Sequence, residues 1–131
     1  MNKTQKSLIK IILGPAIVLV LHIIADLTGL YYEIFWLDVP MHFLGGVAIA
    51  FSAYYFLTYA DITSKQVAVK LLSLFLILAL TALSAVGWEI FEYGMDRIFK
   101  TRMQPSVHDT MKDLAFGLLG GAIAGITLLR K

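Results

Sequence analysis

The chain has 131 residues, of which 59% are hydrophobic, and a formal net charge of +2. A soluble domain is usually about 45–50% apolar, so this composition indicates a membrane protein. The sequence contains no cysteine, which excludes disulfides, iron–sulfur clusters and thiolate zinc sites within this chain, and its charge gives no sign of nucleic-acid binding.

Four apolar runs predict four transmembrane helices. Residues 43–60, 71–87 and 114–129 carry no charged side chain, and residues 8–25 are interrupted only by Lys10 and His22. A bilayer core about 30 Å thick needs about 20 helical residues, and the polar ends of each run can reach the headgroups. We therefore expect an all-α integral membrane protein, a four-transmembrane-helix bundle. It should form a single domain over residues 1–131, with helices at about 8–27, 40–59, 67–99 and 109–129.

The first helix and the connection after it carry two features. Pro15 lies near the beginning of the helix and can bend it, while His22 and Asp26 lie one turn apart near its end. Residues 28–39 are rich in aromatic side chains, which are typical of the membrane–water interface. We expect this connection to lie along the bilayer surface or to dip into it.

The second helix is expected to begin near Asp38 and Pro40, because an acid followed by a proline in the first turn is a common helix opening. His42 follows one turn after Asp38, so the acid and the imidazole share one helix face. Gly45 and Gly46 come next and would let another helix approach closely.

The third helix is longer than the bilayer requires, and acids begin where its apolar run ends. Glu89, Glu92 and Asp96 are spaced i, i+3 and i+7, so they form one stripe if the helix continues past Trp88. Like charges at this spacing repel, and the stripe therefore requires protonation, a cation or full exposure to water. The last turns must project beyond the hydrocarbon or line a protein cavity.

The fourth helix follows a short basic loop and combines acids at its start with glycines along its length. Asp109 and Asp113 are spaced i, i+4 and face the acidic end of the third helix across that loop. Gly117, Gly121 and Gly125 recur at every fourth residue, a pattern typical of tight helix packing in lipid. Such faces would also support a homo-oligomer.

Basic residues favour an orientation with both chain termini in the cytoplasm, because four spans place the two termini on one side. The terminal side carries Lys3, Lys6, Lys10, Lys65, Lys70, Arg130 and Lys131, and the other side carries Arg97, Lys100, Arg102 and Lys112. We therefore expect a multi-pass protein of the plasma (inner) membrane.

Acids and histidines gather at the opposite, extracytoplasmic end. Each helix contributes one polar pair there: His22 and Asp26, Asp38 and His42, Glu89 and Glu92, Asp109 and Asp113. Membrane insertion does not require this arrangement, and helical bundles build metal sites from carboxylates and imidazoles on several helices. The pattern predicts a site for a divalent metal ion (Mg, Mn, Zn or Fe).

We expect three groups of residues to take part in this site. The metal ligands are expected to be His42, Glu89, Glu92, Asp109 and Asp113, of which Glu89 and Glu92 would also be catalytic. The residues expected to orient these ligands or face a substrate are His22, Asp38, Asp96 and His108. The residues expected to hold an anionic lipid headgroup are Arg97, Lys100, Arg102 and Lys112.

Simpler interpretations remain open for the residues at the helix beginnings. Asp38 and Asp109 stand where N-caps are common, and Thr110 with Asp113 resembles a capping box. An acid near a helix N-terminus contributes about 0.3–1 kcal/mol through the helix dipole, which is reason enough for it to be there.

Other members of the set differ in how easily a structural role explains them. Asp96 and His108 can be solvated, and His22 can be a core histidine with a hydrogen-bond partner. Glu89 and Glu92 are harder to explain, because the helix dipole disfavours acids near a C-terminus and the pair follows directly on an apolar run.

An ordered set of motifs resembles the YjdF-type family of small inner-membrane proteins. The motifs are Asp38-x-x-x-His42-Phe43-x-Gly45-Gly46, then Trp88-Glu89-x-Phe91-Glu92, then Gln104-x-x-x-x-Asp109-Thr110-x-x-Asp113 and a glycine-rich last helix. A looser resemblance to VanZ-type membrane proteins depends on the Asp and His that open the second helix. The resemblance covers residues 38–125 and implies the architecture and the polar motif, and it supplies no reaction.

Three functions are consistent with this pattern. The first is a metal-dependent enzyme, a membrane hydrolase that acts on a lipid or lipid-linked phosphate, in which the cation activates water or polarises a phosphoryl oxygen. The second is an ion, metal or proton transporter, although the middles of the helices lack ionisable residues. The third is a non-catalytic scaffold or sensor that the metal stabilises. Membrane lipids are the expected partners in the first case.

Overall fold

The computed structural model describes residues 3–63 and 66–130, leaving out the side chains of residues 3, 4 and 6. Its elements are α1 (Lys3–Leu27), α2 (Leu30–Glu33), α3 (Asp38–Tyr59), α4 (Val67–Phe99) and α5 (Val107–Leu129). Four of these helices, α1, α3, α4 and α5, are long and apolar enough to cross a membrane. The predicted all-α architecture with four membrane-spanning helices is therefore confirmed.

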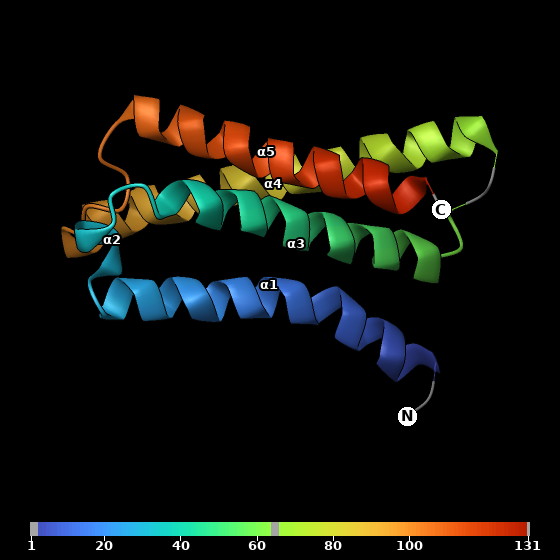
Figure 1. The fold of residues 1–131 in the computed structure, drawn as a ribbon, viewed down its shortest axis with the longest axis horizontal. Coiled ribbons are helices and arrows are strands. Elements are labelled where there is room, and N and C mark those ends of the chain that lie inside the picture. The colour runs from blue at the N-terminus through green and yellow to red at the C-terminus, as the bar shows by residue number, and fades with distance from the viewer. Residues whose placement is uncertain (1–2, 64–65, 131) are drawn as a thin grey trace.

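The long helices lie side by side, and α1 begins at the same end of the molecule at which α5 ends (Figure 1). The opposite end, here called the acidic end, holds α2, the beginnings of α3 and α5 and the end of α4. Lys65, Lys131 and the side chains of Lys3 and Lys6 lie outside the described part of the chain. The side of the membrane that each end faces therefore stays a prediction.

Glycine permits a close backbone contact between α3 and α5. A β-carbon at Gly46 would overlap the backbone carbonyl of Gly117, and one at Gly120 would overlap the carbonyl of Phe43. Without a hydrophobic driving force between helices in lipid, close backbone approach supplies van der Waals energy instead. The glycine face of α5 thus holds α3 against it and sets the distance across the acidic end.

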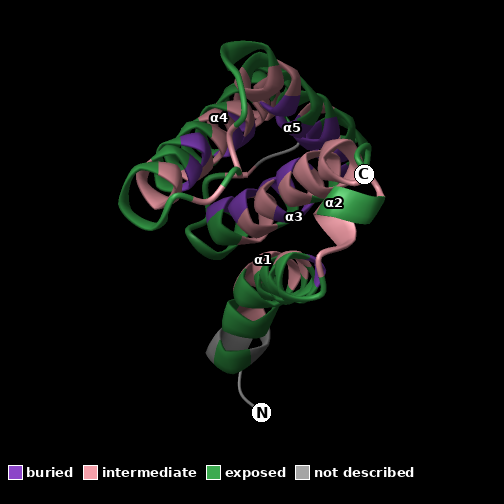
Figure 2. Ribbon diagram, turned by 90° about the vertical axis from the view of Figure 1, so that its left-hand side faces the viewer, coloured by how far each residue is buried: buried purple, intermediate pink, exposed green. Residues whose placement is uncertain are grey.

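Most buried residues of the bundle lie where α3, α4 and α5 face one another (Figure 2), in a core of Ala50, Ala53, Leu57, Ile77 and Ala124. Two buried hydroxyls on α4 are satisfied within their own helix. Ser73 donates to the carbonyl of Val69 and Thr81 donates to that of Ile77, each at 2.8 Å. Many large apolar side chains are exposed along the spans, as expected of surfaces that face lipid.

Helix α1 lies at the edge of the bundle and packs mainly against α3. Pro15 has no N–H, so the carbonyl of Ile11 loses its usual partner within α1. The hydroxyl of Ser52 on α3 donates to this carbonyl, which anchors α1 at its bend (Figure 1). The carbonyl that Pro15 leaves without a partner in α1 thus accepts a hydrogen bond from α3 instead.

Candidate metal centre

The beginnings of α3 and α5 and the end of α4 meet at the acidic end. Helix α3 has Leu37 at its N-cap position, and α5 is capped by Ser106, whose hydroxyl accepts from the backbone N–H of Asp109 at 3.1 Å. Neither Asp38 nor Asp109 is the N-cap residue, but both lie in the first turn of their helix, where the helix dipole favours an acid. Both carboxylates are available for other contacts.

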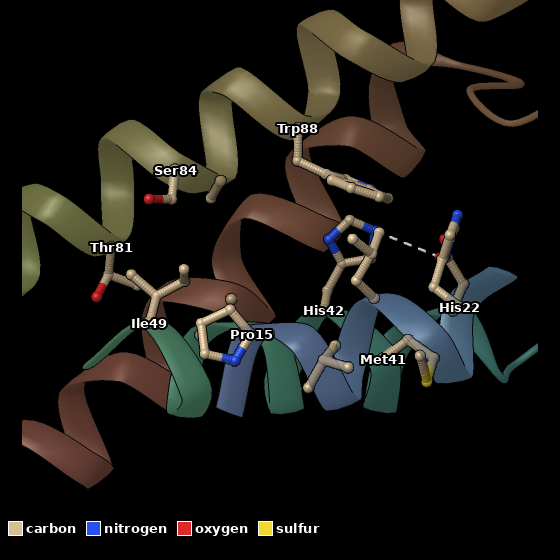
Figure 3. A pocket seen from close by; sticks show the side chains of 15 residues that line it. Pro15, His22, Met41, His42, Ile49, Thr81, Ser84 and Trp88 are labelled. Atoms are coloured by element: carbon tan, nitrogen blue, oxygen red, sulfur yellow. Dashed lines mark ion pairs between the residues drawn. The ribbon is translucent and has the colours of Figure 1, made fainter. Parts of the chain in front are cut away.

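His42 lies at the middle of the site, with a carboxylate facing each of its ring nitrogens. Nε2 is 3.3 Å from Asp38 Oδ1, one turn earlier on α3, and Nδ1 is 4.0 Å from Glu89 Oε1 on α4. The pair of His42 and Asp38 is drawn as a dashed line in Figure 3. The imidazole therefore links the first turn of α3 to the buried acids of α4.

Two groups of possible ligand atoms share this imidazole. One consists of Asp38, His42 and Asp113, and the other of His42, Glu89 and Glu92; in each, the atoms lie within 4.8 Å of one another. Bonds of about 2.1 Å place two donors on one cation at most about 4.2 Å apart. Small side-chain rotations would therefore bring either group around a cation.

Two buried carboxylate oxygens at the site have no hydrogen-bond partner among the residues that the structure describes. They are Glu89 Oε1 and Asp113 Oδ1, on side chains that are 6% and 2% exposed. An unpaired buried polar group costs about 1–3 kcal/mol, and a charged one costs more. Asp113 Oδ1 has the Lys112 ammonium 3.5 Å away, whereas Glu89 Oε1 is positioned to bind something that carries positive charge or donates a hydrogen bond.

The other oxygens of the two α4 acids are held by neutral donors. Trp88 Nε1 donates to Glu92 Oε1 at 2.8 Å, and Gln104 Nε2 donates to Glu89 Oε2 at 2.8 Å and to the backbone carbonyl of Glu89 at 3.2 Å. Donors of this kind orient carboxylates without neutralising them, as the outer partners of metal ligands do. Glu89 is fixed so that its free oxygen faces His42.

The comparisons identify the family of this chain. The family described as predicted membrane protein (DUF2238) matches residues 8–131. The chain is a DUF2238 protein. This agrees with the YjdF-type resemblance carried by its motifs. An uncharacterized protein of Thermotoga maritima is 34% identical over 99 residues, which cover 75% of this chain and 50% of the relative. The DUF2238 chain thus spans about half the length of that relative. No solved structure matches the DUF2238 chain.

Asp109, a predicted ligand of this DUF2238 protein, lies outside both groups of possible ligand atoms. Its carboxylate pairs with Lys112 Nζ at 2.6 Å, and the same ammonium is 3.5 Å from Asp113 Oδ1. Lys112, which was expected to face a headgroup, is directed toward these two acids instead. Asp38, which was expected to orient ligands or face a substrate, lies beside His42 and belongs to one of the two groups of possible ligand atoms.

Asp96 organises the loop between α4 and α5. Its carboxylate accepts hydrogen bonds from the hydroxyl of Thr101 and from the backbone N–H groups of Met103 and Gln104. The loop thereby carries Gln104 back to Glu89 on α4. Asp96 acts on the site only through the loop.

His22 has local partners that account for its position. Its Nδ1 is 2.8 Å from the Tyr31 hydroxyl, and its ring meets Trp88 edge-on with 4.8 Å between centroids. Burial, with nearby Asp38, Glu92 and Asp26, raises the pKa of Tyr31 well above its usual range, so the phenol stays neutral. His22 braces Trp88 from the α1 side of the site.

The remaining predicted residues lie at the surface of the DUF2238 chain. His108 is exposed, as are the expected headgroup-binding residues Arg97, Lys100 and Arg102. Trp88 and Gln104 take part in the site although neither was predicted to do so. The spacing of Trp88 four residues before Glu92 could have indicated one contact, whereas the loop position of Gln104 carries no such periodic signal.

Proposed function

We propose that this membrane protein binds a divalent cation between α3 and α4 at the acidic end of its bundle. The observation that carries the proposal is the buried Glu89 Oε1, which has no hydrogen-bond partner in the described chain and faces His42 Nδ1 at 4.0 Å. A cation there would bind His42 Nδ1 with the carboxylates of Glu89 and Glu92. Ionised carboxylates in such a buried place need compensation by positive charge.

The charges around the two groups favour the α4 side. Asp113 Oδ1 already has the Lys112 ammonium 3.5 Å away, whereas within the described ranges the only basic group paired with Glu89 is His42. On this arrangement Asp38 accepts from His42 Nε2 and directs Nδ1 at the cation, the carboxylate–histidine–metal relation common in metalloproteins. Oxygen and nitrogen donors of this kind suit Mg, Mn, Zn or Fe.

Three protein ligands leave positions on the cation open for water or substrate, which is typical of catalytic rather than structural metal sites. We therefore favour an enzyme, with the cation polarising a phosphoryl oxygen or activating water. Transport has less support, because the buried mid-helix hydroxyls of Ser73 and Thr81 are directed to carbonyls of their own helix. The extracytoplasmic position of the site and the plasma membrane location remain part of this proposal.

The test is elemental analysis of protein purified in detergent. We expect one divalent metal per chain in the native protein and in Glu33→Gln, an exposed acid on α2 that serves as the matched control. Glu89→Gln and Glu92→Gln should lose the metal. Equal metal content in all four proteins, or none in the native protein after incubation with Mg, Mn, Zn and Fe, would refute the proposal.

A further inference from the structure

An apolar cavity of about 280 Å³ lies beside the metal centre, inside the membrane-spanning part of the bundle. Its walls come mainly from α1, α3 and α4, and include Pro15, Val18, Leu19 and Ile49. Figure 3 shows His22, His42 and Trp88 gathered at one end of it, where Asp38 also reaches the lining. The cavity is thus a largely hydrocarbon space with polar groups at its acidic end.

The side of the cavity between α1 and α4 faces the bilayer. Along the described ranges α1 packs extensively against α3 and only marginally against α4, while Leu19 and Ser84, both lining residues, are exposed. At the acidic end the rings of His22 on α1 and Trp88 on α4 are in contact, so these two side chains must separate to admit a headgroup there. A molecule from the lipid phase could therefore enter sideways, with its polar end toward the site.

Apolar cavities do not hold water well, and an engineered one of about 150 Å³ stays dry and takes up benzene. This cavity is larger and is surrounded by lipid chains, the nearest apolar molecules. Its polar end is acidic, so an anionic headgroup would be repelled by Asp38 and Glu89 unless a cation lay between them.

We propose that the cavity binds the hydrocarbon chain of a membrane phospholipid, which enters between α1 and α4 with its phosphate on the cation at His42. The position of the phosphate rests on the proposed metal centre, whereas the position of the hydrocarbon chain in the cavity does not. This makes a phospholipid the substrate class of the site.

Gly45 supplies a variant that fills the cavity with little strain elsewhere. It lines the cavity, and a β-carbon built on it meets nothing within 4 Å. Gly87 on α4 is equally unobstructed and does not line the cavity, which makes it the matched control. Gly45→Leu and Gly87→Leu add the same side chain to a membrane-spanning helix.

The experiment is native mass spectrometry of the purified proteins after incorporation into nanodiscs of one defined phospholipid, with metal content measured on the same samples. We expect one retained phospholipid per chain in the native protein and in Gly87→Leu, and at least a tenfold loss of retention in Gly45→Leu with its metal kept. Chelation should weaken retention by the native protein.

Each other outcome has a separate meaning. Equal lipid retention by Gly45→Leu and Gly87→Leu overturns the cavity as the lipid site. The same conclusion follows if the native protein is a lipid-free dimer and Gly45→Leu is a monomer. If lipid retention depends on Gly45 but is unchanged by chelation, only the proposed contact between phosphate and cation is overturned. If the native protein holds lipid but no metal, and Gly45→Leu loses the lipid, the proposed metal centre is refuted and the cavity remains the binding site of the hydrocarbon chain.

Discussion

Replacing Glu89 by glutamine should reverse the order of stability between native protein and variant, depending on whether metal is present. In the metal-free native protein, Glu89 Oε1 is buried and lacks a hydrogen-bond partner among the described residues. The variant removes the charge at this position and keeps a carbonyl oxygen that can accept from Gln104. In the presence of a chelator, the free energy of unfolding of Glu89→Gln should therefore exceed that of the native protein by about 1–3 kcal/mol, so the variant is the more stable of the two.

Metal should change this order. A cation at a thousand times its dissociation constant stabilises the folded state by about 4.1 kcal/mol, which exceeds the advantage of the variant. The native protein should gain this amount, whereas Glu89→Gln, with a broken ligand set, should gain little.

The assay is reversible unfolding in mixed detergent micelles, followed by tryptophan fluorescence, with chelator and then with saturating Mn²⁺. Glu33→Gln is the control and should follow the native protein in both conditions, because Glu33 is exposed. If Glu89→Gln is less stable than the native protein by the same amount with and without metal, Glu89 has a structural role and the reasoning is refuted.

Three further changes test how the site is supported. Gly46→Ala should destabilise the fold by about 1–3 kcal/mol, because its β-carbon would overlap the carbonyl of Gly117, whereas Gly87→Ala should not; unfolding in micelles measures both. Ser52→Ala should cost about 0.6 kcal/mol and loosen α1, measured by hydrogen exchange at Ile11 and its neighbours, and unchanged exchange would contradict the anchoring role. Asp96→Asn should weaken metal affinity about 10- to 100-fold by releasing the loop that holds Gln104; titration with Mn²⁺ measures it, and unaltered affinity would show that the loop does not act on the site.

The membrane helices could be predicted from the sequence because uncharged runs near 20 residues have few alternatives in a chain this apolar. The convergence of His42, Glu89, Glu92 and Asp113 could also be anticipated, because each lies at the same end of an expected span. Position along each span placed these side chains at one depth in the membrane, and helical periodicity placed Glu89 and Glu92 on one face.

The partners of individual acids could not be predicted in the same way. Asp38 and Asp109 have the same sequence context, an acid in the first turn of a helix, yet one contacts His42 and the other pairs with Lys112. The difference depends on the rotation of α3 and α5 about their axes, which the glycine contacts between them determine. Gln104 lies in a loop, where no helical period relates it to Glu89.

The most direct measurement of the metal centre is an anomalous-scattering map from crystals of the native protein loaded with Mn²⁺. We expect a single strong peak at the acidic end, about 2.0–2.2 Å from His42 Nδ1 and from oxygens of Glu89 and Glu92. A map without a peak there, or with peaks only at exposed acids such as Asp61, would contradict the proposed site.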